Sequence, residues 1–381
     1  MTSELVKIPS VTTMEGMAMN DFFKAWFTDL RIPVRVYPSG KGTANFFADY
    51  GSTEGPGRFV FNGHQDTKPV TGMTIDPYSG EVRDGRLYGR GSADMKGGIA
   101  AVLCALKAMV KAGVKPAGAV TFYSDIEEEY GGGGGYYHAI EKGLLRGYEG
   151  LISCEPTELE LHIGNRGCFI TAFRVAGKAA HSGMADEGVN AIQHAAEFIV
   201  EFAKLPYLQT RDRIFGRSMY NFEKIEGGLY LSAVPDSCTV CLDSRLIPET
   251  PPEAVQAQID GLMRKLQNER GIRIEEIVPP SSWRPGSSKL KAEAIPENHP
   301  LVGMMAGAIT KATGGQAIVG GCPAVTIAMA VIKEGLPAII CGPGSIKQAH
   351  TADEWVATEQ IVKACHIYAA MMAQMQGAPG S

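Results

Sequence analysis

The sequence predicts an α/β protein whose mostly parallel sheet is interrupted by a smaller inserted α+β domain. Strands and helices alternate through the first third of the chain, the pattern changes after about residue 166, and α/β character returns near the C-terminal end. Alternating strands and helices are typical of a sheet that is covered by helices. We therefore expect residues 1–166 and 285–381 to form one discontinuous domain and residues 167–284 to form the insertion.

The first domain is predicted from four segments. Short apolar strands lie within 58–64 and 147–157, residues 97–113 have helical spacing, and 117–129 is a strand that runs into an acidic loop. In sheets of this kind, ligands bind beyond the carboxyl ends of the strands. Functional side chains are therefore sought where these strands end.

The inserted segment follows the order strand, helix, strand, strand, helix, strand. Its helices are expected at 189–205 and in PEAVQAQIDGLMRKLQNE. This order predicts a ferredoxin-like α+β sandwich with an antiparallel sheet. Residues 279–300 are rich in proline and serine and predict a linker back to the first domain.

Composition excludes several functional classes. The chain has 381 residues, a formal charge of −5 and 45% hydrophobic residues, which is ordinary for a globular enzyme. No basic run predicts nucleic-acid binding, and no apolar stretch predicts a membrane span. The first residues lack a signal-peptide pattern, so we expect a cytoplasmic protein.

The eight cysteines are scattered, and most lie in apolar runs, which indicates buried reduced thiols. Cys238 and Cys241 form a CxxC within a predicted strand, where residues three apart face opposite sides. This argues against a shared metal or a redox disulfide.

Two segments carry single candidate metal ligands. His64 and Asp66 stand two apart at a strand end, so Asp66 could accept a hydrogen bond from one ring nitrogen while the other nitrogen binds a metal. Turn capping by both residues is the alternative. Asp94 precedes the helix that begins GGIAA, and from this segment alone a helix N-cap is favoured over a bridge between cations.

Three further segments strengthen a metal hypothesis. Glu127, Glu128 and Glu129 follow a strand directly and would repel one another unless cations or protons compensate; a solvated acidic loop is the alternative. The glycine run after them lacks the Lys-Ser/Thr of a phosphate loop, which excludes nucleotide binding there. Glu155 and His350 follow two more predicted strands. Oxygen and imidazole ligands at one sheet edge suit Zn²⁺, Mn²⁺ or Co²⁺.

Taken together, these segments resemble the M20 metallopeptidase family, which contains acetylornithine deacetylase, succinyl-diaminopimelate desuccinylase, aminoacylase and carboxypeptidase relatives. The shared pattern is His-x-Asp, an Asp after Gly-x-x, Glu-Glu-x-Gly, a later Asp or Glu, and a C-terminal His. The chain carries it in order, over nearly its whole length, as His64, Asp66, Asp94, Glu128, Glu129, Gly131, Glu155 and His350.

The resemblance implies a centre for two divalent metal ions, with zinc as the first expectation and cobalt or manganese as alternatives. Asp94 would bridge the two ions. His64 and Glu155 would complete one site, and Glu129 and His350 would complete the other.

The resemblance also implies that Asp66 orients the metal-binding histidine and that Glu128 is the general base. If the register of the acidic loop slid by one residue, the base and the ligand would become Glu127 and Glu128. The glycine spacing favours Glu128 and Glu129.

In the insertion, GKAAHSGMADEGVNAI resembles the family segment whose histidine, here His181, reaches across a homodimer to the neighbouring active site. LDSRLIP resembles the segment whose arginine, here Arg245, clamps a substrate carboxylate. The insertion would therefore be a lid and dimerisation domain. Two departures, Ser232 where relatives have Asn and Cys322-Pro323 where they have Thr-Asp, leave the substrate open.

The predicted function is hydrolysis of the amide bond of an N-acyl amino acid, as in acetylornithine deacetylase, by metal-activated water. A di- or tripeptidase and a hydrolase of an unusual amide or amine in a degradative pathway are the alternatives within the enzymes. A metal-binding relative without catalysis is the non-enzyme alternative. The expected partners are a small amide with a carboxylate and a second copy of the chain, but neither nucleic acid nor membrane.

Overall fold

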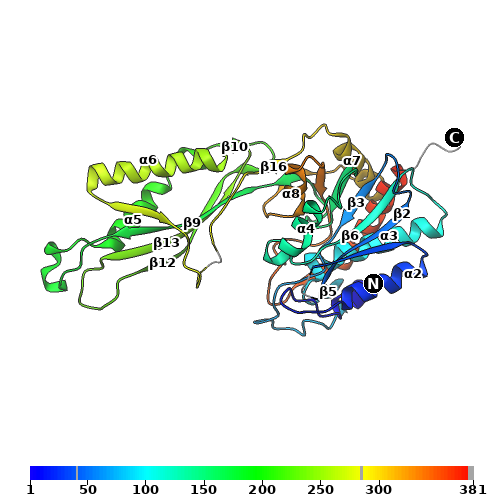
Figure 1. The fold of residues 1–381 in the computed structure, drawn as a ribbon, viewed down its shortest axis with the longest axis horizontal. Coiled ribbons are helices and arrows are strands. Elements are labelled where there is room, and N and C mark those ends of the chain that lie inside the picture. The colour runs from blue at the N-terminus through cyan, green and yellow to red at the C-terminus, as the bar shows by residue number, and fades with distance from the viewer. Residues whose placement is uncertain (40–41, 284–285, 376–381) are drawn as a thin grey trace. The chain divides into compact units, whose positions relative to one another are not determined.

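The chain folds into two compact units in the computed structural model, which describes residues 1–39, 42–283 and 286–375. The core unit comprises Met1–Asn165 and the chain from Ala294 onward, and the inserted unit comprises Arg166–Glu293 (Figure 1). The core unit is therefore built from two separate stretches of sequence.

The core unit contains one large mixed sheet with the strand order β1-β2-β6-β3-β7-β18-β8-β16, and β17 also pairs with β8. The pairs that join β6, β3, β7 and β18 are parallel, which agrees with the predicted α/β class. The edge formed by β1 and β2 is antiparallel because the connection between these strands is too short for a crossover. The strands are β1 (Val34–Pro38), β2 (Ala44–Gly51), β3 (Phe59–Asn62), β6 (Ala119–Ser124), β7 (Gly150–Ser153), β8 (Leu161–Asn165), β16 (Glu293–Ala294), β17 (Val319–Cys322) and β18 (Ala338–Ile340).

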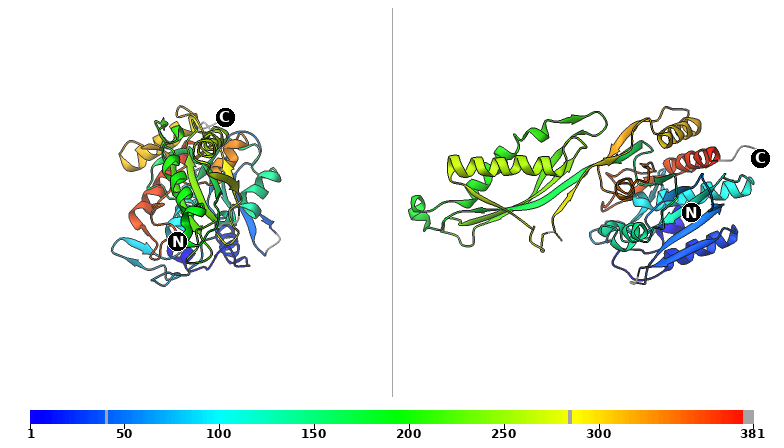
Figure 2. Two further views of the ribbon diagram at one scale, coloured as in Figure 1. Left: turned by 90° about the vertical axis from the view of Figure 1, so that its left-hand side faces the viewer. Right: turned by 45° about the horizontal axis from the view of Figure 1, so that its top comes forward.

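Helices cover both faces of this sheet (Figure 1 and Figure 2). Alternation along a strand sends neighbouring aromatic side chains to opposite faces. Phe122 packs on Phe23 of α2 (Ala18–Asp29) at 5.2 Å between ring centroids, whereas Tyr123 belongs to the opposite core with residues of α8 (Ile327–Lys333). Phe61 meets Tyr368 of α9 (Thr358–Gln374) at 5.5 Å. Within the described residues, no helix is long and apolar enough to cross a bilayer.

The parallel strands bring their carboxyl ends to one edge of the sheet, where α3 (Gly97–Lys111) also begins. A side chain at Gly98 would collide with the carbonyl oxygen of Cys154, just past β7. The glycine therefore lets the start of α3 lie directly against the end of β7. This close approach brings the residues before α3 to those that follow the strands.

The inserted unit is an antiparallel sheet with the strand order β12-β13-β9-β14, to which β15 adds by pairing with β9. Its two long helices share an apolar core with the strands, in which Phe173 and Phe198 lie 5.0 Å apart. The order of strands and helices is the predicted one. The elements are β9 (Gly167–Ala176), α5 (Ala191–Phe202), β12 (Met219–Gly227), β13 (Ser237–Leu246), α6 (Pro252–Arg270), β14 (Arg273–Ile277) and β15 (Ser288–Leu290).

The predicted linker at 279–300 is more structured than expected. It contains β15 and β16, which pair with β9 and join the core sheet, respectively. Both strands are short and rest on pairing with distant parts of the chain. Local proline and serine content gives no sign of such pairing, so the two strands were not predicted, although the segment does connect the inserted unit to the second stretch of the core unit.

The eight cysteines all lie within the described residues, and none of them forms a disulfide. Cys238 and Cys241 both lie in β13, but Cys238 belongs to the apolar core of the inserted unit, whereas the Cys241 thiol lies 3.9 Å from the Glu223 carboxylate on β12. The two thiols therefore occupy different surroundings, as their spacing in a strand predicts.

Asp125, just past β6, is a fully buried carboxyl group. Asn62 donates a hydrogen bond to it at 2.8 Å, but burial still raises its pKa from 3.8 to about 6. Because the folded chain holds this proton more tightly than the unfolded chain, stability falls as pH rises through that interval. Asn cannot lose a proton, so the unfolding free energy of Asp125→Asn should rise relative to that of wild type as pH increases. We expect this relative gain to be about 1–3 kcal/mol from pH 4.5 to pH 8, measured by urea unfolding of chelator-treated protein. An equal difference at both pH values would contradict the assignment.

Candidate metal centre

Five separate segments of the core unit bring six histidine and carboxylate side chains to the carboxyl edge of the sheet. Each of these segments follows a parallel strand or precedes α3. The residues are His64 after β3, Asp94 before α3, Glu128 and Glu129 after β6, Glu155 after β7, and His350 after β18.

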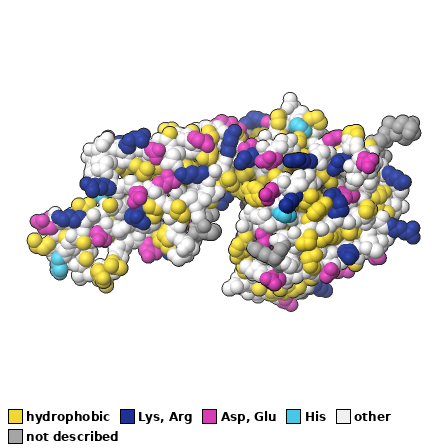
Figure 3. Space-filling model, in the orientation of Figure 1, with side chains coloured by type: hydrophobic (Ala, Val, Ile, Leu, Met, Phe, Trp, Pro, Cys, Tyr) yellow, Lys and Arg dark blue, Asp and Glu magenta, His cyan; other side chains and the backbone are white. Residues whose placement is uncertain are grey.

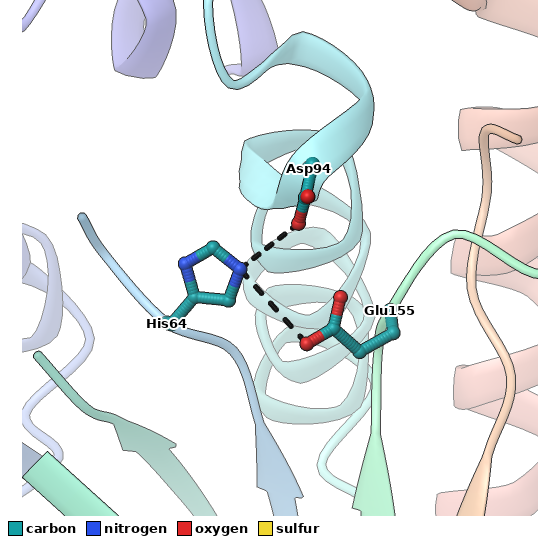
Figure 4. Close-up of side chains that lie close together, drawn as sticks. All are labelled: His64, Asp94 and Glu155. Carbon is teal, nitrogen blue, oxygen red and sulfur yellow. Dashed lines mark hydrogen bonds and ion pairs between the residues drawn. The ribbon is translucent and has the colours of Figure 1, made fainter. Parts of the chain in front are cut away.

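His64, Asp94 and Glu155 form the first ligand group, with one ligand atom from each lying within 4.8 Å of the others. His64 Nε2 is 2.9 Å from Asp94 Oδ1 and 3.9 Å from Glu155 Oε1. All three side chains are buried, and all three point toward one another (Figure 4). Two oxygens and one imidazole nitrogen thus converge on a single point.

Asp94, Glu129 and His350 form the second ligand group within the same limit. His350 Nε2 lies 3.2 Å from Asp94 Oδ2 and 3.1 Å from Glu129 Oε2. Asp94 therefore presents one carboxylate oxygen to each group. The N-cap of α3 is Lys96, so the helix-cap interpretation of Asp94 was wrong.

The pKa values of the cluster reflect its excess of negative charge. Burial, reinforced by Asp94, raises the pKa of Glu155 well above its usual range, and burial with the neighbouring carboxylates raises that of Glu128 to about 8. Hydrogen bonds to Asp94 and Glu129 raise the pKa of His350 to about 9. Burial alone would lower the pKa of His64, but its bond to Asp94 and the charge of Glu155 raise it.

Divalent cations fit this arrangement chemically. Buried carboxylates need compensating positive charge, and a mixture of oxygen and imidazole donors suits Zn²⁺, Co²⁺ and Mn²⁺. Each ligand group supplies three protein ligands, which leaves coordination positions for water or substrate as in catalytic sites.

Asp66 acts on the cluster differently from the prediction. His64 Nδ1 lies 2.9 Å from the backbone carbonyl oxygen of Asp66, whereas the Asp66 carboxylate is 3.7 Å away. That carboxylate accepts hydrogen bonds from Thr12 Oγ1 at 2.6 Å and from the backbone N–H groups of Glu128 and Glu129 at 3.2 and 3.3 Å. Asp66 therefore holds the histidine through its backbone and the acidic loop through its side chain.

Glu127 is turned toward the glycine run. Its backbone has a left-handed φ of 57°, and its carboxylate accepts a hydrogen bond from the N–H of Gly134 at 2.8 Å. A side chain at Gly135 would collide with the carbonyl oxygen of Ile126, so this glycine allows the run to fold back on the loop. It is Glu129, not Glu128, that meets His350, which agrees with the register favoured by the glycine spacing.

Sequence reasoning missed a buried ion pair that holds the backbone of Asp94. Glu354 Oε1 accepts hydrogen bonds from the N–H groups of Ala93 and Asp94 at 3.0 and 3.1 Å, and Oε2 lies 2.7 Å from Arg90 Nη1. The Arg90 and Glu354 side chains are only 4% and 1% exposed. No local pattern joins these residues; the one signal is a charged residue beside the apolar strand β19 (Trp355–Ala357).

Glu354→Gln should destabilise the protein by about 3–5 kcal/mol, because it leaves the charge of Arg90 buried without its partner. The matched control is Glu359→Gln, which breaks the exposed 2.6 Å pair with Lys363 and should destabilise the protein far less. Denaturant unfolding of both variants measures the difference. Equal unfolding free energies for the two variants would show that the buried pair stabilises the protein no more than the exposed pair does.

His181 and Arg245 belong to the inserted unit and to neither ligand group. His181 is exposed, and its Nδ1 accepts a hydrogen bond from the N–H of Gly183 at 3.1 Å. Arg245 on β13 contacts Asp243 through Nε at 2.9 Å and Nη2 at 3.0 Å. Ser232 has a φ of 63°, and its carbonyl oxygen accepts a bond from the Ser182 N–H at 2.9 Å.

Cys322 ends β17 and is buried. Burial, with the charges of Glu155 and Glu128, raises the pKa of this thiol to about 12. The thiol at this departure from the family pattern is therefore neutral and close enough to the carboxylates to feel their charge.

The profile of Peptidase family M20/M25/M40 matches residues 60–374. The chain belongs to this family. An acetylornithine deacetylase from Erwinia tasmaniensis is 29% identical over 378 residues, which cover 93% of this chain and 91% of that protein. A second, from Yersinia pseudotuberculosis, is 28% identical over 92% of this chain and 90% of that protein.

Among solved structures, a Staphylococcus aureus tripeptidase has the same fold, with a TM-score of 0.80, 22% identity, and coverage of 98% of this chain and 96% of that one. A dinuclear metal-binding M20 peptidase from Bacillus subtilis gives a TM-score of 0.66 at 14% identity over 98% of this chain and 96% of that one. The chain is thus an M20-family metallohydrolase with clustered candidate metal ligands.

Proposed function

We propose that this M20-family chain hydrolyses the amide bond of an N-acyl amino acid and that both ligand groups bind a divalent cation, zinc first. The observation that carries the proposal is Asp94, which faces a ligand group with each of its two oxygens. Glu128 stands beside the groups, and the two acetylornithine deacetylases above support the substrate class. When bound, the cations would supply Lewis acidity that makes water acidic and polarises the substrate carbonyl.

Glu128 is the proposed general base. Among the described residues, its carboxylate has no hydrogen bond or ion pair, whereas its backbone N–H is fixed by Asp66. Without bound cations, burial and the neighbouring carboxylates raise the pKa of Glu128 to about 8, so this group can hold a proton and return it to the leaving amine. The carboxylate is therefore positioned by its backbone and free to exchange protons.

The inserted unit would supply substrate contacts. A ring nitrogen that accepts a backbone N–H carries no proton, so His181 in its neutral form has its proton on Nε2 and can donate to a developing oxyanion. Arg245 is held by Asp243 with its guanidinium in a fixed plane, which suits bidentate binding of a substrate carboxylate.

A homodimer through the inserted unit is part of the proposal. Leu229, Tyr230 and Leu231 are 79%, 74% and 97% exposed, and an isolated β-bridge joins the next turn, at Ala233, to His181. Hydrophobic side chains are visible on the surface of this unit in Figure 3. Exposed apolar patches mark interaction sites, so we expect Leu231→Asp to convert a dimer to a monomer in light scattering.

Substrate screening tests the proposed reaction. The chain should release amino acid from one or more N-acyl amino acids in a panel, and chelator should abolish the release until Zn²⁺, Co²⁺ or Mn²⁺ is restored. Cleavage of di- or tripeptides alone would replace the N-acyl substrate with a peptide. Chelator-insensitive turnover, or metal analysis that finds no cation in active protein, would refute the metal-dependent reaction.

A further inference from the structure

A lysine lies against the second ligand group. Lys68 Nζ is 3.2 Å from Glu129 Oε2 and also donates a hydrogen bond to the carbonyl oxygen of Glu129. The same Oε2 atom lies 3.1 Å from His350 Nε2. One oxygen of the second group is therefore shared between the histidine and the lysine ammonium group.

The position of Lys68 is fixed by its surroundings. Its side chain is 32% exposed, and Nζ lies 5.6 Å from the centre of the Tyr130 ring. The next residue, Pro69, accepts a hydrogen bond from Arg90 Nη2 at 3.1 Å, which anchors the backbone. The ammonium group thus stays close to Glu129 rather than extending into solvent.

The first ligand group has no such neighbour. Within residues 1–39, 42–283 and 286–375, Asp94 and Glu155 form ion pairs with histidines alone, and no lysine or arginine lies within ion-pair distance of either. The two groups share Asp94 and have equal numbers of ligands. The lysine is therefore a clear electrostatic difference between them.

We propose that Lys68 weakens cation binding at the second ligand group, so that the first group fills first and the second fills only at higher metal concentration. A positive charge near Glu129 reduces the attraction of this oxygen for a divalent ion and occupies part of its bonding capacity. The inference rests on the proposed function, which treats both groups as cation sites. It makes the fully loaded form of the protein dependent on metal supply.

Calorimetric titration of the metal-free 381-residue chain with Co²⁺ tests the proposal, with bound metal counted by equilibrium dialysis and elemental analysis. Wild type should bind two ions, the second at least about tenfold more weakly than the first. Lys68→Met, which keeps the length and removes the charge, should tighten the second step about tenfold or more and leave the first unchanged. Lys68→Arg should stay near wild type.

A matched control separates this effect from net charge. Lys363→Met removes the same charge from an exposed pair with Glu359 and should change neither constant. Lys68→Gln, measured in parallel, makes the result independent of the folding of one variant. Two bound ions with the same second constant in wild type and both neutral Lys68 variants would overturn the role of Lys68 alone. Fewer than two bound ions at saturating Co²⁺ in both the wild type and the neutral Lys68 variants would refute the two-cation proposal itself.

Discussion

Glu128→Gln is expected to lower kcat by about 10²–10⁴-fold and to leave bound metal near the wild-type level. Glutamine keeps the size of the side chain and the backbone N–H that Asp66 holds at 3.2 Å, but it cannot take a proton from water. Glu128 belongs to neither ligand group, so metal content should not follow the loss of rate. Steady-state kinetics and elemental analysis on one preparation measure both quantities.

The neighbouring residue provides the control for this experiment. Glu127→Gln makes the same chemical change one position earlier, where the carboxylate faces Gly134, and should alter kcat by no more than a few-fold. If Glu127→Gln were inactive and Glu128→Gln active, the base would be Glu127. If Glu128→Gln lost metal in proportion to activity, Glu128 would be a ligand instead.

Asp94→Ala should abolish activity and weaken the binding of both cations by more than about 100-fold. Even a residue that only supports a ligand is worth about 10–100-fold in metal affinity, and Asp94 is the one residue that belongs to both groups. Elemental analysis after dialysis against a fixed metal concentration should find less than one ion per chain.

Single-group variants make the result specific. Glu155→Ala removes a ligand from the first group only, and His350→Ala removes one from the second group only, so each should retain about one ion. The number of ions bound per chain in the three variants then shows which residues belong to which site. Retention of both ions by Asp94→Ala would show that this carboxylate does not bridge two sites.

The sequence predicted the convergence of the site well because the fold enforces it. The carboxyl ends of parallel β3, β6, β7 and β18 meet at one edge, so a histidine or carboxylate just past each strand end lies near the others. Strands β1 and β2, which pair in antiparallel fashion beside β6, do not change where these carboxyl ends lie. Strand prediction therefore indicated which candidate residues would lie near one another, whereas Asp94, which precedes α3, was singled out by the family resemblance.

The sequence was less informative where a contact does not follow from local strand geometry or residue spacing. The two-residue period of a strand predicts that the Asp66 carboxylate hydrogen-bonds the His64 ring. However, β3 ends at Asn62, and beyond it the backbone carbonyl oxygen of Asp66 makes this contact instead. The Arg90–Glu354 pair joins residues far apart in sequence. Its existence depends on packing, which residue spacing alone cannot indicate.

The hydrogen bond from the Asp94 N–H to Glu354 spans 260 residues of sequence and crosses the whole insertion. A growing polypeptide on the ribosome will therefore have synthesised the whole insertion before this hydrogen bond to Asp94 can form. Hydrolytic competence then depends on residues that follow the insertion as well as on those that precede it. Nascent fragments that end within the insertion would carry His64, Asp94 and Glu155 but no finished centre.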